Sequence, residues 1–252
     1  MCDYNKENDV ILKKELQDEC ISANDMIVSA TCLMIDDYLK ALGDIKGRIN
    51  TIADLGCGYG GITLLTKKYL KADKAYGIDR DTKKNALSSA RGICTFNVDL
   101  NHEPIPINDN EVDLVICNGV IEHLAFYDNV LLEAYRILRH DGYFFITMPN
   151  LANYIQRISL LLGYQPSDVS VSSKIQVGTL FDAGKETVGH AHSATLGAIT
   201  QLLNYYNFEV ISVRKGKPKV IGTYMYLNPI MKIIGYIVPK TLARRLIIVS
   251  QK

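Results

Sequence analysis

Three aspartates each follow a short apolar stretch of this sequence, and all three have the chemistry to contact one ligand. Asp54 follows Thr51-Ile52-Ala53, Asp79 ends the run from Ala75, and Asp99 follows Phe96-Asn97-Val98. Apolar stretches of this length, separated by helix-length segments, predict parallel β-strands whose carboxyl ends meet at one edge of a sheet, where ligands bind. A carboxylate there can accept hydrogen bonds from ribose hydroxyls or from an adenine amino group. Asp79 is the candidate for the ribose, and Asp99 is the candidate for the adenine. A fourth stretch, Val112–Cys117, brings Asn118 to the same edge.

A glycine-rich turn comes directly after Asp54. Gly56, Gly58 and Gly61 fit the G-x-G-x-x-G pattern of dinucleotide-binding folds, in which backbone N–H groups approach a ligand at a helix N-terminus. Asp54 counts against a dinucleotide, because its carboxylate would repel a pyrophosphate. It would instead attract an ammonium and a sulfonium, by roughly a few kcal/mol in a partly desolvated cleft. The predicted ligand is therefore S-adenosylmethionine, and the alternative is a turn whose glycines only permit tight packing.

A series of motifs runs in order from Asn50 to Asn150. They are Asp54-x-Gly56-x-Gly58-x-Gly60, Gly77-Ile78-Asp79, Asp99-Leu100, Asp113-Leu114-Val115, Ile121-Glu122-His123-Leu124 and Leu138-Arg139-His140-Asp141-Gly142-Tyr143. In this order they resemble the motifs of class I S-adenosylmethionine-dependent methyltransferases. The Ile-Glu-His-Leu tetrapeptide is similar to the branch that contains quinone-biosynthesis methyltransferases and many small-molecule and glycan methyltransferases.

A looser similarity continues through Pro149, Arg157 and Gly189-His190. It resembles methyltransferases of surface-polysaccharide and glycolipid pathways. His192 and Ala194 stand where those enzymes commonly have Arg and Phe, so this part of the resemblance is incomplete.

The resemblance implies a cofactor site and an acceptor site. The implied cofactor-binding residues are Asp54, Gly56, Cys57, Gly58, Gly60, Asp79, Arg80, Asp99, Leu100 and Asn118. The resemblance places His123 on the side of the transferred methyl group, and His123 and His190 are the candidate catalytic residues, because histidine suits a base near neutral pH. The candidate acceptor contacts are Tyr154, Arg157, His190 and His192. The plain alternatives are that His123 packs against the start of its own helix, and that His190 and His192 flank the start of another helix. No metal site is expected.

The patterning predicts an α/β fold of βαβ units. Helices are expected near residues 62–71, 82–90, 124–138, 151–162 and 196–206, with Asp81 as the N-cap of the second. With the resemblance, this implies a Rossmann-like, doubly wound, mostly parallel seven-stranded sheet that has helices on both faces and an antiparallel last strand.

Two parts of the chain are expected. Residues 1–48 are interpreted as an N-terminal helical extension, because Ile27, Cys32, Ile35 and Leu39 have helical spacing. Residues 49–252 are expected to form the methyltransferase domain. Within it, residues 150–193 are expected to form a substrate cap, because so long a weakly patterned segment in a compact domain is usually a lid or a binding loop.

Composition agrees with one enzyme domain, since 252 residues suffice to bury about 70–75% of the unfolded surface. The six cysteines form no C-x-x-C pair, which favours reduced thiols and a cytoplasmic location. The N-terminal residues lack a signal-peptide layout, and no apolar run approaches the roughly 18–20 residues of a membrane span.

Charge is unevenly distributed although the formal net charge is only +1. Residues 210–252 contain Lys and Arg but no Asp or Glu, whereas the first forty residues lean acidic. This asymmetry is explained by an anionic partner such as a membrane surface in peripheral contact, by a solvated basic face, or by complementarity between the two ends. The apolar stretch 226–239 lies between the basic residues, and core packing is favoured for it over the membrane surface. Nucleic acid is not expected, because Asn118-Gly119-Val120-Ile121 lacks the Asn-Pro-Pro-Tyr-like tetrapeptide that methylates exocyclic amines.

These observations predict an enzyme that transfers a methyl group to a small-molecule, sugar or glycan, or lipid-linked acceptor, with S-adenosylhomocysteine as the product. Oxygen is the expected target, and the reaction is an in-line displacement. Positioning of the reactants can supply about 7–11 kcal/mol of the barrier reduction, against roughly 3–5 kcal/mol from a base. The alternatives are a catalytically silent cofactor-binding module and an NAD-dependent oxidoreductase.

Overall fold

The structure is a computed structural model that describes residues 35–180, 183–187, 189–216, 233–234 and 237–252. Residues 1–34 of the expected N-terminal helical extension lie outside the described residues, and α3 (Ile35–Leu42) is the described part of it. Most of the apolar stretch 226–239 also lies outside them, as do Lys217, Lys219 and Lys232 of the basic region.

Seven strands form one sheet in the order β3-β2-β1-β4-β5-β7-β6. The parallel part consists of β1 (Thr51–Leu55), β2 (Lys74–Asp79), β3 (Cys94–Asn97), β4 (Val112–Asn118) and β5 (Leu138–Pro149). The last strand, β7 (Arg245–Gln251), pairs antiparallel with both β5 and β6 (Glu209–Gly216). The predicted Rossmann-like, mostly parallel sheet with an antiparallel last strand is confirmed. Its strand order reverses between β1 and β4, and a ligand crevice forms at such a reversal.

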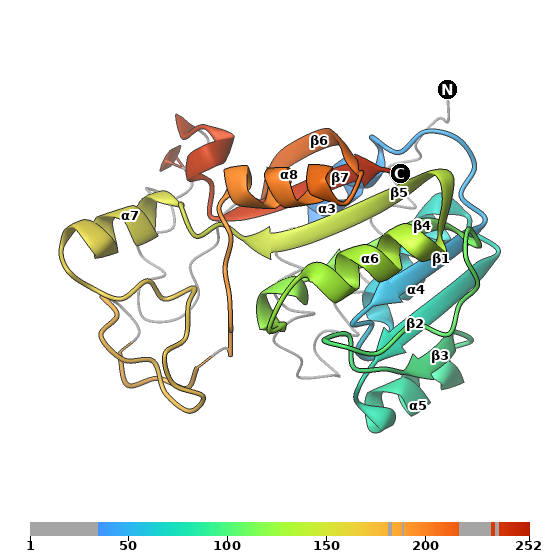
Figure 1. Ribbon diagram of the computed structural model, residues 1–252, viewed down its shortest axis with the longest axis horizontal. Helices are drawn as coiled ribbons and strands as arrows, with labels where there is room; N and C mark the ends of the chain where they lie inside the picture. Colours follow the sequence, from blue (N-terminus) through green and yellow to red (C-terminus); the bar gives the residue numbers. More distant parts are fainter. Residues whose placement is uncertain (1–34, 181–182, 188, 217–232, 235–236) are drawn as a thin grey trace.

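Helices α4 (Gly61–Leu70), α5 (Thr82–Ala90), α6 (Asp128–Ile137) and α8 (Leu196–Tyr205) connect the strands (Figure 1). Asp81 is the N-cap of α5, as predicted, because its carboxylate accepts hydrogen bonds from the backbone N–H groups of Lys83 and Lys84. The expected start of α6 near residue 124 is wrong, because the short 3₁₀ helix η1 (Ile121–His123) precedes it. Similarly, α7 (Tyr154–Leu161) begins later than expected, where the Asn153 side chain caps it.

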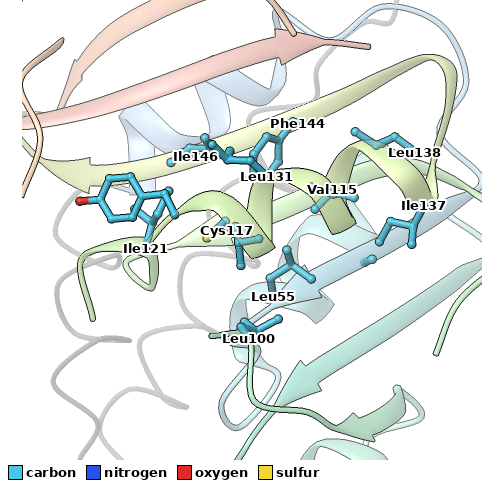
Figure 2. Close-up of a cluster of buried hydrophobic side chains, with 14 of the residues drawn as sticks. Leu55, Leu100, Val115, Cys117, Ile121, Leu131, Ile137, Leu138, Phe144 and Ile146 are labelled. Carbon is cyan, nitrogen blue, oxygen red and sulfur yellow. The ribbon is translucent and has the colours of Figure 1, made fainter. Parts of the chain in front are cut away.

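Strand side chains alternate between two apolar cores. Leu55, Val115 and Phe144 belong to the core under α6 and α8, together with Leu131 and Ile137 of α6 (Figure 2). Their neighbours in the strands, among them Ile52, Leu114, Ile116 and Phe145, belong to the core under α3 and α4. Both faces of the sheet are therefore covered by helices, as predicted, which explains why the strands read as nearly continuous apolar runs.

The described residues of segment 150–193 contain α7 and otherwise irregular structure, which extends beyond the end of β5 to one side of the sheet (Figure 1). The segment begins and ends at the carboxyl edge of the sheet. The Leu151 N–H donates to the Ala194 carbonyl, and the N–H groups of Ala191 and His192 donate to the Glu122 carbonyl. This arrangement is what a cap would require, but the assignment as a substrate cap stays a prediction.

One arginine of the basic C-terminal region forms an ion pair with an aspartate that follows the described helix α3. Asp44, just after α3, receives hydrogen bonds from the Nε and Nη2 atoms of Arg214 in β6, and these hold the pKa of the Asp44 carboxyl below its usual range. Part of the basic C-terminal region is therefore engaged within the chain. No helix in the described part of the chain is long and apolar enough to cross a membrane.

The core under α6 and α8 generates a first prediction. Phe208 is 2% exposed, and its ring lies 5.2 Å from the ring of Phe144 and 5.4 Å from that of Tyr135, between centroids. We expect Phe208→Ala to lower the free energy of unfolding by about 3–5 kcal/mol, because it leaves a cavity that these rings cannot fill. Urea denaturation followed by circular dichroism measures the loss.

Tyr205→Ala is the matched control, since Tyr205 is 77% exposed. Its free energy of unfolding should change by no more than about 0.5 kcal/mol. Equal losses in the two variants would contradict the placement of Phe208 in this core.

Candidate functional site

The turn between β1 and α4 is built on glycines with left-handed backbone. Gly56, Gly58 and Gly60 have φ angles of 78°, 53° and 80°, which residues with a side chain rarely adopt. A Cβ atom on Gly56 would overlap the Val120 side chain, and one on Gly60 would overlap Ile93 and Ser88. The glycines therefore allow both the bend and its close packing against the segments after β4 and α5.

Asp79 joins this turn to the end of β2. Its Oδ2 atom accepts a hydrogen bond of 3.0 Å from the Gly58 N–H, and its Oδ1 atom accepts one of 2.9 Å from the Asp81 N–H. A carboxylate oxygen has two lone pairs, so each atom keeps the capacity to accept a further hydrogen bond. Two backbone donors thus fix the carboxylate in one orientation.

A cavity of about 380 Å³ lies at this edge of the sheet, within the size range of about 300–1,000 Å³ that is usual for small-molecule sites. Its walls come from the ends of β1, β2 and β4, the first turn of α5, the loop after β3, the segment around η1, and Gly189 near the end of segment 150–193. The lining residues are Gly56, Asp79, Arg80, Lys84, Val98, Asp99, Leu100, Asn101, Gly119, Val120, His123, Leu124 and Gly189.

Five of the predicted cofactor residues line this cavity, namely Gly56, Asp79, Arg80, Asp99 and Leu100. Asp99 lies two residues beyond β3, in a turn where its Oδ1 atom accepts hydrogen bonds from the backbone and side-chain amides of Asn101. These bonds hold the pKa of the Asp99 carboxyl below its usual range. The cavity wall thus carries an ionised carboxylate next to the apolar side chain of Leu100.

Asp54 does not line the cavity, contrary to the expectation that its carboxylate faces the ligand. The residue is 2% exposed, and its Oδ2 atom accepts a hydrogen bond from the Thr63 hydroxyl of α4. Burial, with a smaller contribution from the nearby Asp79 charge, raises the pKa of Asp54 to about 7. Near neutral pH, Asp54 is therefore divided between its neutral and charged forms.

The four other predicted cofactor residues also lie outside the lining of this cavity. Cys57 is buried, and its sulfur occupies the space beside Gly77. Gly58 donates to Asp79, and Gly60 begins α4, so both shape the turn from within. The Asn118 side chain is buried and accepts a hydrogen bond from the Thr147 hydroxyl. We assign these residues to the support of the cavity wall.

The candidate catalytic histidines meet at the edge of the cavity. His123 lines it, and the His123 and His190 rings are 4.9 Å apart between centroids, in an edge-to-face arrangement. The Nδ1 atom of His123 lies 3.2 Å from the Gly189 carbonyl oxygen. Burial, together with the neighbouring His123 and Arg245, lowers the pKa of His190 to about 4, so His190 is neutral near pH 7.

The other candidate acceptor contacts lie outside the cavity lining. Tyr154 is the first residue of α7, and burial raises the pKa of its hydroxyl. Arg157 is exposed and donates through Nε to the Ala152 carbonyl, while the His192 ring stacks on Phe126 with 5.8 Å between centroids. Their role in acceptor binding stays a prediction.

Residues 53–146 match the family model that is described as a methyltransferase domain. This chain contains a methyltransferase domain. The matched segment runs from β1 into β5 and includes every residue of the cavity lining except Gly189.

Two curated relatives give the same indication. The chain is 29% identical over 127 residues to the probable methyltransferase PMT19 of Arabidopsis thaliana. The aligned residues cover 48% of this chain and 20% of that protein. It is 33% identical over 103 residues to a probable S-adenosylmethionine-dependent methyltransferase of Mycolicibacterium smegmatis. The aligned residues cover 39% of this chain and 38% of that protein. The chain thus spans less than half the length of these curated relatives.

A solved structure extends the similarity to the fold as a whole. The structure of a SAM-dependent methyltransferase from Archaeoglobus fulgidus matches with a TM-score of 0.56 at 15% identity, over 86% of this chain and 92% of that one. The class I methyltransferase fold is therefore confirmed, while the branch that was inferred from Ile121–Leu124 stays a prediction.

Several residues of the methyltransferase domain's cavity were not predicted from the sequence. Lys84 lies in the first turn of α5, soon after Asp79 and Arg80, and Asn101 follows Asp99-Leu100, so proximity to a predicted residue was the available signal for both. Arg245 had no local signal. It belongs to β7, and its Nη2 atom lies 3.5 Å from Oε1 of the buried Glu122, whose pKa burial raises.

The raised pKa of Asp54 generates a prediction about stability and pH. In the unfolded chain its pKa is about 3.9, and in the folded chain about 7. Between these values the unfolded state releases the proton and the folded state keeps it, so stability falls as the pH rises, by up to about 4 kcal/mol. Asn cannot ionise, so we expect Asp54→Asn to gain stability relative to the wild type from pH 4.5 to pH 8.

Urea denaturation at several pH values measures this difference, and any pH-independent effect of the substitution cancels. Asp81→Asn, at the partly exposed N-cap of α5, is the control and should show no such gain across this range. A constant difference between Asp54→Asn and the wild type would contradict the raised pKa.

Proposed function

We propose that this chain is an S-adenosylmethionine-dependent methyltransferase that acts on a hydroxyl oxygen of a small-molecule, sugar or glycan, or lipid-linked acceptor. The observation that carries the proposal is the convergence of Asp79, Asp99 and His123 on the walls of one cavity. All three lie within the segment that matches a methyltransferase domain.

The cavity suits an adenosyl ligand. Asp79 is held by two backbone donors at the end of β2, and its remaining lone pairs are available to the two hydroxyls of a ribose. Asp99, Asn101 and Leu100 offer hydrogen-bonding atoms and an apolar surface to an adenine ring. Gly56 has no side chain to fill the space beside Val120, so the backbone of the turn can approach the ligand.

When bound, S-adenosylmethionine supplies a methyl carbon that its sulfonium activates for displacement. The protein then has to hold the acceptor oxygen in line with that carbon at about 3–3.5 Å, which is the larger part of the catalytic effect. His123 is on the cavity wall, and His190, near the end of the cap segment 150–193, packs against it, so both can contact an entering hydroxyl. The overall products are the methylated acceptor, S-adenosylhomocysteine and a proton.

An acceptor with an apolar part is supported by the cap segment. Ile158, Leu160, Leu161 and Leu162 of α7 and its end are all exposed, with Leu161 at 85%. Exposed apolar side chains gathered on one short helix are typical of contact with a ligand or a membrane surface. This favours a lipid-linked acceptor, with peripheral membrane contact, over a free sugar.

The cysteines support a cytoplasmic location in this proposal. Cys57, Cys94 and Cys117 are free thiols in the described part of the chain, and two of them are buried. Thiols persist in the reducing cytoplasm, whereas secreted proteins commonly pair theirs.

Isothermal titration with S-adenosylmethionine tests the cofactor half of the proposal, and no binding to a folded sample would overturn it. Formation of S-adenosylhomocysteine with phenols, nucleotide-linked sugars and lipid-linked sugars tests the transfer. Cofactor binding without turnover on any hydroxyl acceptor would favour the catalytically silent binding module instead.

Asp79→Ala gives the sharpest test of the ribose contact. A hydrogen bond to a charged group contributes about 1.5–3 kcal/mol, so we expect S-adenosylmethionine affinity to fall by roughly 10- to 150-fold. Titration calorimetry measures the affinity, and circular dichroism verifies that the variant is folded.

Asp81→Ala is the matched control. It removes a carboxylate two residues away that caps α5 and does not line the cavity, so its affinity should stay near that of the wild type. If Asp79→Ala bound the cofactor as tightly as Asp81→Ala does, the assignment of Asp79 to the ribose would be wrong.

A further inference from the structure

Besides Nε of Arg245, two buried polar atoms near the cavity lack a hydrogen-bond partner in the part of the chain that the structure describes. They are Oε2 of Glu122 and Nδ1 of His190. Glu122 is 1% exposed, so water does not reach its carboxylate from the open solvent. Because buried polar atoms in folded proteins are nearly always paired, such unpaired atoms indicate a bound ion or an ordered water.

Both residues belong to a compact group of three side chains that could bind a metal ion. One ligand atom each from Glu122, His123 and His190 lies within 4.8 Å of the other two. Glu122 and His123 come from η1, and His190 lies near the end of the cap segment. Residues that the chain separates widely are therefore brought to one point on the acceptor side of the cavity.

The second polar atom of each side chain is already held by the protein. The Nδ1 atom of His123 faces the Gly189 carbonyl at 3.2 Å, and the His190 ring makes a hydrogen bond with the Asp168 backbone. Oε1 of Glu122 faces Arg245 at 3.5 Å. Histidines that bind metal commonly donate their other ring N–H to a backbone carbonyl, which orients the free nitrogen. The same arrangement here leaves one free ligand atom on each residue.

We propose that Glu122, His123 and His190 bind one divalent first-row transition-metal ion, such as Mn²⁺, Fe²⁺ or Zn²⁺. Two imidazoles and one carboxylate suit these ions, whereas Mg²⁺ and Ca²⁺ prefer oxygen ligands throughout. Three protein ligands leave further coordination positions open. The positive charge of Arg245 opposes the ion, so a chelator should remove it readily.

The inferred role of the ion rests on the proposed function. An acceptor hydroxyl in an open position would lose its proton to water more easily, because the ion stabilises the oxyanion. That oxygen would then form the new bond to the methyl carbon as the carbon–sulfur bond breaks. His123 and His190 would act by holding the ion.

Titration of the chelator-treated, full-length protein with MnCl₂ alone tests the site. The protein carries no polyhistidine tag, and Mn²⁺ is used because cysteine thiols compete for Zn²⁺. The electron paramagnetic resonance signal of free Mn²⁺ reports binding, and we expect one ion per chain. His190→Ala and Glu122→Gln should each weaken binding by at least about tenfold, since loss of groups that only orient the ligands already costs about 10- to 100-fold.

His140→Ala is the matched control, because His140 is an exposed histidine near the opposite end of β5 and should leave Mn²⁺ binding unchanged. Absence of Mn²⁺ binding to the wild type, or equal binding to Glu122→Gln and the wild type, overturns the site. Glu122→Gln keeps the shape of the side chain, so it remains informative if His190→Ala misfolds.

A parallel titration with S-adenosylmethionine separates this site from the proposed function. Cofactor binding without Mn²⁺ binding overturns the metal site alone. Mn²⁺ binding that depends on Glu122, in a protein that does not bind the cofactor, supports the metal site and overturns the proposed function.

Discussion

The hydrogen bonds between the β1–α4 turn and the end of β2 determine the shape of the site. The N–H groups of Gly56 and Cys57 donate to the Ile78 carbonyl, and the Gly58 N–H donates to the Asp79 carboxylate. The Asn85 side chain of α5 donates to the Asp79 carbonyl from the other side. Ile78 and Asp79 at the end of β2 thus fix the glycine turn, the start of α5 and a carboxylate on the cavity wall. Because the left-handed glycines alone permit this approach, the cavity depends on them as much as on the acids.

Much of the fold was predictable because its signals are local. The apolar runs of β1, β4 and β5, the glycine turn and the Asp81 cap each occupy a few consecutive residues. The side of the sheet on which the Asp54 side chain lies also follows from the sequence. Side chains alternate along a strand, and Ala53 and Leu55 belong to the core under α6. Asp54 must therefore point to the opposite face, where Thr63 of α4 meets it.

The acceptor side was less predictable, for a physical reason. Glu122 and His123 are adjacent, but His190 and Arg245 reach them only through the return of the cap segment and the antiparallel insertion of β7. No periodicity in the sequence records these contacts. The motif Ile121–Leu124 indicated that Glu122 and His123 belong to the site. Their contacts with His190 and Arg245 are visible only in the folded chain. The same holds for loops in general, because the helices and strands that a loop connects determine its position.

His123 joins the two halves of the site. Its side chain lines the cavity that we assign to the cofactor, contacts the Gly189 carbonyl and packs against the His190 ring. Gly189 lines the same cavity, so the last residues of the cap segment form part of its wall. A ligand that fills the cavity therefore contacts the residues that hold the end of the cap segment in place. We therefore expect a group that binds between the two histidines to change the affinity of the cavity for its ligand, and the reverse.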